Sequence, residues 1–184
     1  MSKLTVRQIL LSAAEALHLD EASAYLSGKS TKLGETNDLL RCYNLVENEL
    51  ALDYLPLQAE ETFETSTGVL YYSTFDNAIV RVLHVSDESG NPTDFKLFPD
   101  YFKTQPGIVN IRYTYSPSPK TIEQVCEYTM QASARLFTYG IAAEYTLALG
   151  MFEESAAWDK KYKDAITAVY RARPCKMLRS RRWV

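Results

Sequence analysis

Histidines, cysteines and glycine-rich loops are the features that most often mark catalysis or metal binding, and this sequence has few of them. It contains two histidines, His18 and His84, and three widely separated cysteines, Cys42, Cys126 and Cys175. No Cys-x-x-Cys pair occurs, although structural zinc sites commonly use one. All seven glycines are isolated from one another, so no phosphate-binding loop is formed. We therefore expect no metal site and no cofactor.

A faint calcium-loop pattern occurs at Asp87-x-Ser89-x-Asn91. Gly90 then occupies the fourth position of the loop rather than the sixth, and no glutamate stands at the twelfth. Gly90 and Asn91 tolerate positive φ, and Pro92 cannot lie within a strand ladder. We interpret this stretch as a hairpin turn.

The carboxylates do not form a pair suited to acid–base catalysis. Glu60, Glu61 and Glu64 lie along one polar strand, and Glu153 and Glu154 lie in the first turn of a helix, where negative charge is stabilising. Catalytic triads assemble in space, and no residue pattern marks one here. We expect the protein not to be an enzyme.

One acid, Glu144, falls near the apolar stripe of a predicted helix. It is either a buried acid with a function or the partner of an arginine such as Arg135 or Arg41. The second interpretation is favoured, because buried charges are usually paired.

The elements that position these residues begin with helices. Thr5-Val-Arg-Gln8 is a capping box and predicts a helix over residues 6–18, which His18 closes. A short helix is expected over 21–26, ended by Gly28. A further helix begins at a Thr36 cap and ends before Asp53, ahead of Pro56.

From about Leu57 to Ser116 the apolar period changes from 3.6 to 2, which predicts four to six short strands. Their connections are short, so the sheet should be antiparallel. Thr121-Ile-Glu-Gln124 is a second capping box and predicts a long helix to Leu149. After Gly150, an apolar stripe predicts a second helix that ends near residue 172, ahead of Pro174.

Together these elements predict an α+β fold, a helical bundle built from both chain ends with an antiparallel β domain inserted between the halves. The expected parts are the N-terminal helices of the bundle, the β domain, the C-terminal helix pair and a basic tail. Their bounds are residues 1–56, 57–117, 118–172 and 173–184.

The charge of the chain is divided unevenly. The 184 residues carry 20 basic and 23 acidic side chains, yet the last fourteen residues hold six basic residues and no acid. Residues 1–170 therefore have a net charge of −9. Such a tail either meets a partner different from that of the body or is a solvated end.

Thirteen tyrosines are many for this length. Tyrosine suits protein interfaces, and it also suits half-buried strands. Five of the tyrosines lie in or beside the predicted strands, and either interpretation accounts for them: Tyr71, Tyr72, Tyr101, Tyr113 and Tyr115.

In their order and residue composition, these segments resemble the head–tail connector proteins of tailed bacteriophages, of the adaptor or tail-tubular type. The resemblance rests on the first helix, on a β insertion ending at Tyr113-Thr-Tyr-Ser-Pro117, and on the later helices that contain Phe137–Tyr145 and Trp158–Ala165. It also rests on Tyr43–Leu57 and on the basic end Arg179–Val184.

The resemblance implies a structural virion protein at the neck, made in the host cytoplasm. It implies a ring, commonly of twelve copies, between the portal protein and a tail or nozzle protein. Genomic DNA would pass through the ring without specific binding, which suits an acidic body, and no membrane would be involved.

In that family the C-terminal segment commonly reaches the portal. The corresponding residues here include arginines and a tryptophan, which are frequent at interface hot spots. The expected partner-binding residues are Arg173, Lys176, Leu178, Arg179, Arg181, Arg182 and Trp183.

Two other functions compete with this interpretation. In the first, the basic tail binds nucleic acid and the body is a regulatory module, although such proteins usually carry basic residues on a folded surface. In the second, the chain is a small hydrolase such as a phage lysin, but it lacks a recognisable nucleophile, metal set or acid pair.

Overall fold

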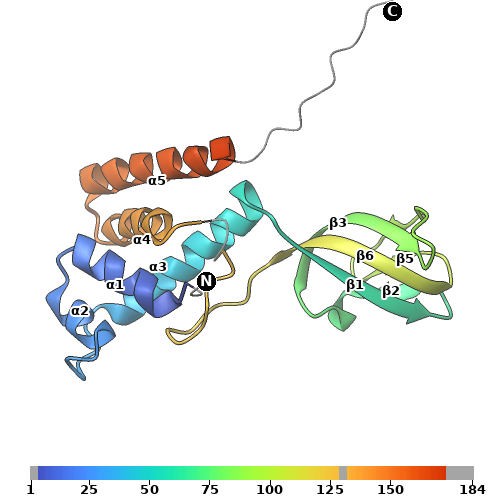
Figure 1. Ribbon diagram of the computed structural model, residues 1–184, viewed down its shortest axis with the longest axis horizontal. Helices are drawn as coiled ribbons and strands as arrows, with labels where there is room; N and C mark the ends of the chain where they lie inside the picture. The colour runs from blue at the N-terminus through green and yellow to red at the C-terminus, as the bar shows by residue number, and fades with distance from the viewer. Residues whose placement is uncertain (1–3, 129–131, 173–184) are drawn as a thin grey trace, which may run out of the picture. The chain divides into compact units, whose positions relative to one another are not determined.

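The computed structural model describes residues 4–128 and 132–172, and it divides the chain into two compact units (Figure 1). The helical unit contains the described residues up to Tyr43 and from Thr121 onward, and the β unit is Asn44–Lys120. The predicted α+β class is confirmed, because helices and antiparallel strands occupy separate parts of the chain. The β unit begins earlier than the predicted insertion, since the last part of the third helix belongs to it.

In the helical unit, the first helix packs against the second and fourth helices, and the fourth packs against the fifth. Apolar residues at helical spacing form the buried side of each helix. The third helix continues into the β unit, where a π-helical turn over Leu50–Tyr54 ends it before Pro56. The helices are α1 (Val6–Ala16), α2 (Asp20–Leu26), α3 (Thr36–Glu49), α4 (Ala134–Ala148) and α5 (Phe152–Ala172).

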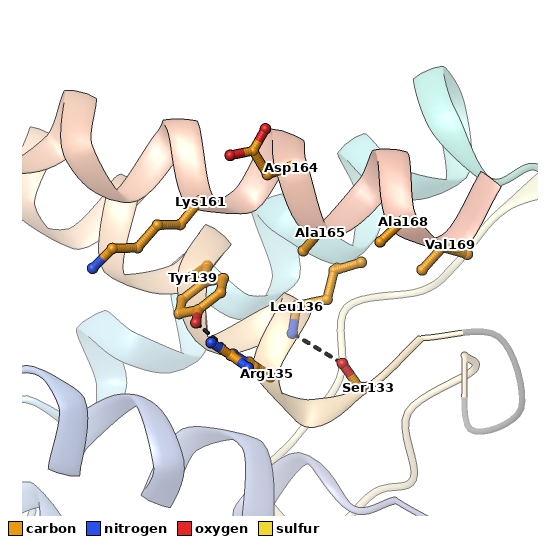
Figure 2. A pocket seen from close by; sticks show the side chains of 9 residues that line it. All are labelled: Ser133, Arg135, Leu136, Tyr139, Lys161, Asp164, Ala165, Ala168 and Val169. Atoms are coloured by element: carbon orange, nitrogen blue, oxygen red, sulfur yellow. Dashed lines mark hydrogen bonds between the residues drawn. The ribbon is translucent and has the colours of Figure 1, made fainter. Parts of the chain in front are cut away.

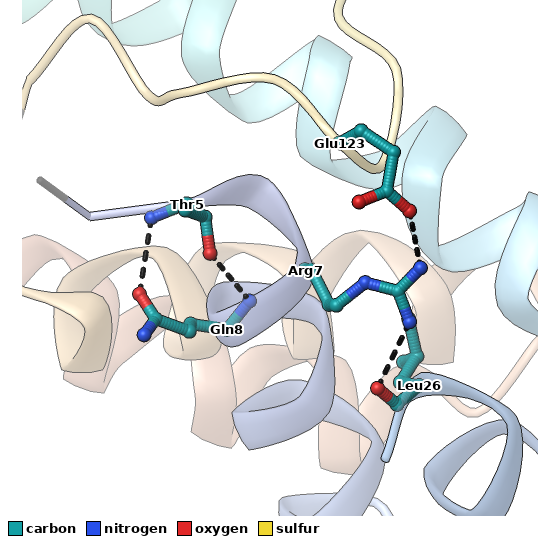
Figure 3. Close-up of polar contacts among 5 residues, drawn as sticks. All are labelled: Thr5, Arg7, Gln8, Leu26 and Glu123. Atoms are coloured by element: carbon teal, nitrogen blue, oxygen red, sulfur yellow. Dashed lines mark hydrogen bonds and ion pairs between the residues drawn. The ribbon is translucent and has the colours of Figure 1, made fainter. Parts of the chain in front are cut away.

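The capping box at the start of α1 is confirmed (Figure 3). The Gln8 amide donates to Thr5 Oγ1 at 3.3 Å, and the Thr5 amide donates to Gln8 Oε1 at 3.1 Å. Arg7 donates to the Leu26 carbonyl at 3.1 Å and forms an ion pair with Glu123. These contacts tie α1 both to the end of α2 and to the segment that precedes α4.

The predicted helix from Thr121 is wrong over its first part, since α4 begins only at Ala134. The amides of Val6 and Arg7 donate to the carbonyls of Gln124 and Ile122 at 3.0 and 3.1 Å. The first amides of a helix have no partner within it, and here a distant segment supplies the acceptors. That segment cannot also use those carbonyls for a helix of its own.

The second capping box is half formed and opens a turn rather than a helix. The Thr121 amide donates to Gln124 Oε1 at 2.7 Å, and the Gln124 amide donates to the Thr121 carbonyl at 3.2 Å. The N-cap of α4 is Ser133, whose hydroxyl accepts from the Leu136 amide at 3.4 Å.

Three helices end in the same hydrogen-bonded motif. After α1, the amides of His18 and Leu19 donate back to the carbonyls of Glu15 and Ala14, which is a Schellman motif. Gly28 and Gly150 occupy the equivalent position after α2 and α4, with φ of 79° and 76°. His18 adopts the same left-handed conformation, with φ of 56°. It therefore ends α1 through its backbone conformation, at the position where the sequence predicts the helix end.

The predicted Thr36 cap is wrong. Thr36 is already the first residue of α3, and its buried hydroxyl has no hydrogen-bond partner among the described residues. The Leu39 amide donates instead to the Glu35 carbonyl at 3.0 Å, so the helix starts one residue earlier than the pattern indicates.

The β unit holds two three-stranded sheets, and every strand pair is antiparallel. One sheet has the order β1-β6-β3 and the other β2-β5-β4. The short strand β5 is absent from the pattern-based prediction, whereas the other strands lie where the period of 2 predicts them. The strands are β1 (Leu57–Thr65), β2 (Val69–Tyr71), β3 (Ala78–Asp87), β4 (Lys96–Leu97), β5 (Tyr101–Lys103) and β6 (Gly107–Ser116).

Aromatic rings form the centre of the β unit. The Phe75 ring lies 4.6 Å from that of Phe63, 6.0 Å from that of Phe102 and 5.3 Å from that of Tyr113, measured between centroids. Tyr113 is fully buried, so it belongs to the core, whereas Tyr71 is 55% exposed and available to a partner. The core interpretation is therefore confirmed for Tyr113, and the interface interpretation stays a prediction for the exposed tyrosines.

The stretch after β3 is a hairpin turn, as predicted. The Asp87 carboxylate accepts hydrogen bonds from the Asn91 amide at 2.8 Å and from its side-chain Nδ2 at 3.1 Å. These bonds stabilise the ionised form and lower the pKa of Asp87. The Asp87 carboxylate therefore stabilises the turn.

Candidate functional site

The predicted partner-binding residues lie outside the described residues. The structure therefore gives no position for any of them: Arg173, Lys176, Leu178, Arg179, Arg181, Arg182 and Trp183. The described part of α5 runs to Ala172.

Among the described residues, no group of three or more histidine, cysteine or acidic side chains could hold a metal ion. His84 is exposed on β3. Cys42 is buried, and burial, followed by the nearby charges of Glu144 and Asp38, raises the pKa of its thiol to about 11. Because the thiolate is the nucleophile, the raised pKa makes Cys42 less reactive than an ordinary cysteine at neutral pH.

Glu144 is half-buried, and it forms no ion pair with another residue that the structure describes. The expected pairing with Arg135 or Arg41 is therefore wrong. Arg135 instead donates from Nε to the hydroxyl of Tyr139, one turn further along α4. Solvent access lets the Glu144 carboxylate stay hydrated without a cation.

The helical unit carries a groove between α4 and α5 with a volume of about 550 Å³ (Figure 2). Leu136 from α4 and three small or branched residues of α5, Ala165, Ala168 and Val169, form its apolar side. Ser155 of α5 donates to the Ala143 carbonyl of α4 at 3.0 Å, a hydrogen bond that joins the two helices.

Two cations lie against aromatic rings at one end of this groove. The Arg135 guanidinium carbon lies 5.3 Å from the centroid of the Tyr139 ring. Lys161 Nζ lies 5.9 Å from the same ring and 3.9 Å from that of Trp158. The two rings lie 5.8 Å apart. A cation over an aromatic face is attracted to it, so the rings hold both charges in place.

The groove combines apolar side chains with two cations held against aromatic rings. The polar side chains that line the groove are Ser133, Arg135, Tyr139, Lys161 and Asp164, and they include no base paired with a nucleophile. Ser133 is engaged as the cap of α4. An apolar floor with two fixed cations fits a partner segment that combines apolar and acidic side chains.

The sequence contains a signal for this cluster in the spacing of two residue pairs. Arg135 and Tyr139 are four residues apart, and Trp158 and Lys161 are three apart. Both spacings place side chains side by side on a helix. Only the packing of α4 against α5 brings the two pairs together.

No helix in the described ranges is long and apolar enough to span a bilayer. Comparison with models of known protein families and with curated proteins finds no match.

Proposed function

We propose that this chain is a structural adaptor of the neck of a tailed bacteriophage, with copies that form a ring between the portal and the tail. The ring continues the DNA channel, and twelve copies are the expected number. The observation that supports this most is the interrupted helical unit. Both chain ends contribute to it, and an antiparallel β unit stands between them. This is the order that the resemblance to connector proteins implies.

In this proposal the helices form the bundle that builds the ring, and the basic tail anchors the ring to the portal. Arg179, Arg181 and Arg182 select an acidic partner surface, and Trp183 and Leu178 supply apolar contact. The α4–α5 groove supports the same partner chemistry, because Val169 lines it close to the end of the described α5 and its cations favour acidic groups.

The acidic body supports passage of DNA without retention. Residues 1–170 have a net charge of −9, and a negative surface does not gain affinity from the release of counterions. The proposal involves no catalysis, no cofactor and no membrane.

The test is assembly onto purified portal rings, followed by negative-stain imaging. The full chain should bind as a ring, and a chain that lacks residues 175–184 should stay folded but lose binding at least about 100-fold, as expected when several hot-spot side chains are removed together. A variant with Arg179, Arg181 and Arg182 changed to lysine is the matched control, which keeps the charge and loses the planar forks. Normal binding by the truncated chain would refute the anchor.

The basic tail also favours a second candidate, a nucleic-acid-binding module. In that case the full chain should be retained on heparin or duplex DNA, with affinity that falls steeply between about 50 and 200 mM salt. If the chain is an adaptor instead, it should elute from heparin or duplex DNA at low salt. It should also form no ring on DNA in the absence of the portal.

A further inference from the structure

The turn between α4 and α5 presents an apolar knob to solvent. Four large apolar side chains within six residues are exposed, namely Leu147 at 47%, Leu149 at 59%, Met151 at 41% and Phe152 at 70%. They surround Gly150, whose left-handed conformation turns the chain from one helix to the next. Single exposed apolar residues are ordinary, but a contiguous group indicates a contact surface.

Two carboxylates border this knob. Glu153 and Glu154 directly follow Phe152 in the first turn of α5, and both are exposed. Neither forms an ion pair with another residue in the described ranges. The knob is therefore apolar with a negative rim.

The β unit carries a hollow of about 540 Å³ that has the complementary character. Its apolar lining includes Ile79 and Val80 of β3, Leu97 of β4 and Phe98 directly after it. Val80, Leu97 and Phe98 are 48%, 57% and 38% exposed. Arg81 lines the same hollow, and its guanidinium has no ion-pair partner among the described residues.

The shape of β3 explains why this hollow is open. The pairing of β3 with β6 shifts register between Ile79 and Arg81, so Val80 has no opposite residue on β6. Such a bulge bends an edge strand and re-aims its side chains. A bulge also hinders an edge strand from pairing non-specifically with the strands of other chains. The exposed apolar side chains of this edge therefore favour one defined partner.

We propose that the Leu147–Phe152 knob of one copy inserts into the Val80–Phe98 hollow of a second copy, with Arg81 facing Glu153 and Glu154. Charge selects this pairing over the symmetric ones. Knob against knob would bring four carboxylates together, and hollow against hollow would bring two guanidinium groups together. Only knob against hollow joins opposite charges around an apolar contact.

A contact between two different surfaces of the same chain is heterologous, so it propagates from copy to copy and closes into a ring when the rotation allows. This inference rests on the proposed function, because a ring requires a contact that repeats from copy to copy. It adds which two surfaces make that contact. It does not involve the portal or the C-terminal tail, so the two proposals can fail separately.

The experiment uses two full-length variants, Phe152→Asp in the knob and Val80→Asp in the hollow, studied by sedimentation and native mass spectrometry. Wild type should associate, and each variant alone should associate at least about 10-fold more weakly, because a buried aromatic anchor carries much of an interface. Each variant keeps one intact surface. An equimolar mixture should therefore form a 1:1 pair that extends no further.

Charge reversal gives an independent readout. Arg81→Glu alone and the double change Glu153→Arg with Glu154→Arg should each weaken association, and a mixture of these two chains should regain part of it. Leu83→Asp is the matched control, since Leu83 is 40% exposed on the same strand but does not line the hollow. It should associate like wild type.

A wild-type chain that stays monomeric at high concentration would overturn the inference and assign the surfaces to another occupant. Variants that associate normally, or a mixture that forms no 1:1 pair, would overturn it as well. Loss of portal binding with intact self-association would refute the adaptor function alone.

Discussion

The core of the helical unit and the core of the β unit are built from the chain in different ways. In the helical unit, distant parts of the chain meet, as when Tyr43 of α3 stacks on Phe137 of α4 with ring centroids 5.5 Å apart. In the β unit, a contiguous stretch closes around Phe75, Phe102 and Tyr113. A contiguous core can form without the rest of the chain, whereas the helical unit needs both ends together.

This difference has a consequence for stability. If the β unit unfolds, Asn44–Lys120 becomes a long loop that connects the two halves of the helical unit. Lengthening a flexible loop is inexpensive, since each doubling costs only about 0.6 kcal/mol. The helical unit should therefore survive the loss of the β unit.

The largest expected effect comes from breaking one core at a time. Phe102→Ala removes a fully buried ring from the β unit and should lower its free energy of unfolding by about 3–5 kcal/mol. Calorimetry should then show two transitions, with only the lower one shifted from wild type. Phe137→Ala is the counterpart in the helical unit. One common transition that moves equally in both variants would contradict the independence of the units.

An intermediate effect is expected from alkaline pH, and it should reach the helical unit first. The folded-state pKa of Cys42 is about 11, above the ordinary value of about 8.5, so the folded state keeps a proton that the unfolded chain loses. This contribution is fully present below about pH 8.5 and is lost as the pH rises through 11, a change on the order of 3 kcal/mol.

Tyr113 gives the β unit the same behaviour at higher pH. Burial, followed by its hydrogen bond to Glu61, raises the pKa of Tyr113 to about 12. Raising the pH from 7.5 to 10.5 should therefore lower the stability of the helical unit more than that of the β unit. Urea unfolding at the two pH values measures both changes. Cys42→Ala should flatten the pH dependence of the helical unit only, and Tyr113→Phe that of the β unit only. An unchanged slope in Cys42→Ala would argue against a buried thiol as the cause.

The smallest expected effect concerns the helix ends of the helical unit. His18 adopts a left-handed conformation that costs an ordinary side chain roughly 1 kcal/mol and costs glycine little. His18→Gly should therefore raise the stability of the helical unit by up to about 1 kcal/mol in urea unfolding. Gly28→Ala should lower it by a similar amount through conformation alone, because no atom lies within 4 Å of the added methyl group. Equal stability of all three chains would mean that the backbone conformation at these positions costs nothing.

Local patterns in the sequence were sufficient for most of the elements. The Thr5–Gln8 capping box starts α1, Gly28 and Gly150 end helices, and the period of 2 locates the long strands. Each of these signals depends on neighbours within a few residues along the chain. The same holds for the turn after Asp87, whose side chain bonds only four residues away.

The elements that were missed depend on contacts between distant residues. The segment after Thr121 has a helix-start pattern, but its carbonyls accept from the amides of Val6 and Arg7. The strand β5 is only three residues long and exists through its pairing with β2 and β4. A short periodic pattern cannot report a partner elsewhere in the chain.

The sequence by itself therefore determined the class of the fold, several of its helix ends and the charge contrast between body and tail. The tertiary structure alone decided which polar and apolar residues meet. It brought Arg135 and Tyr139 of α4 to Lys161 of α5, and it left Phe152 exposed at a turn that a sequence pattern marks only as apolar. The physical reason is that local propensity acts over one or two helical turns, whereas grooves and exposed knobs arise only when separate elements pack and leave some surfaces uncovered.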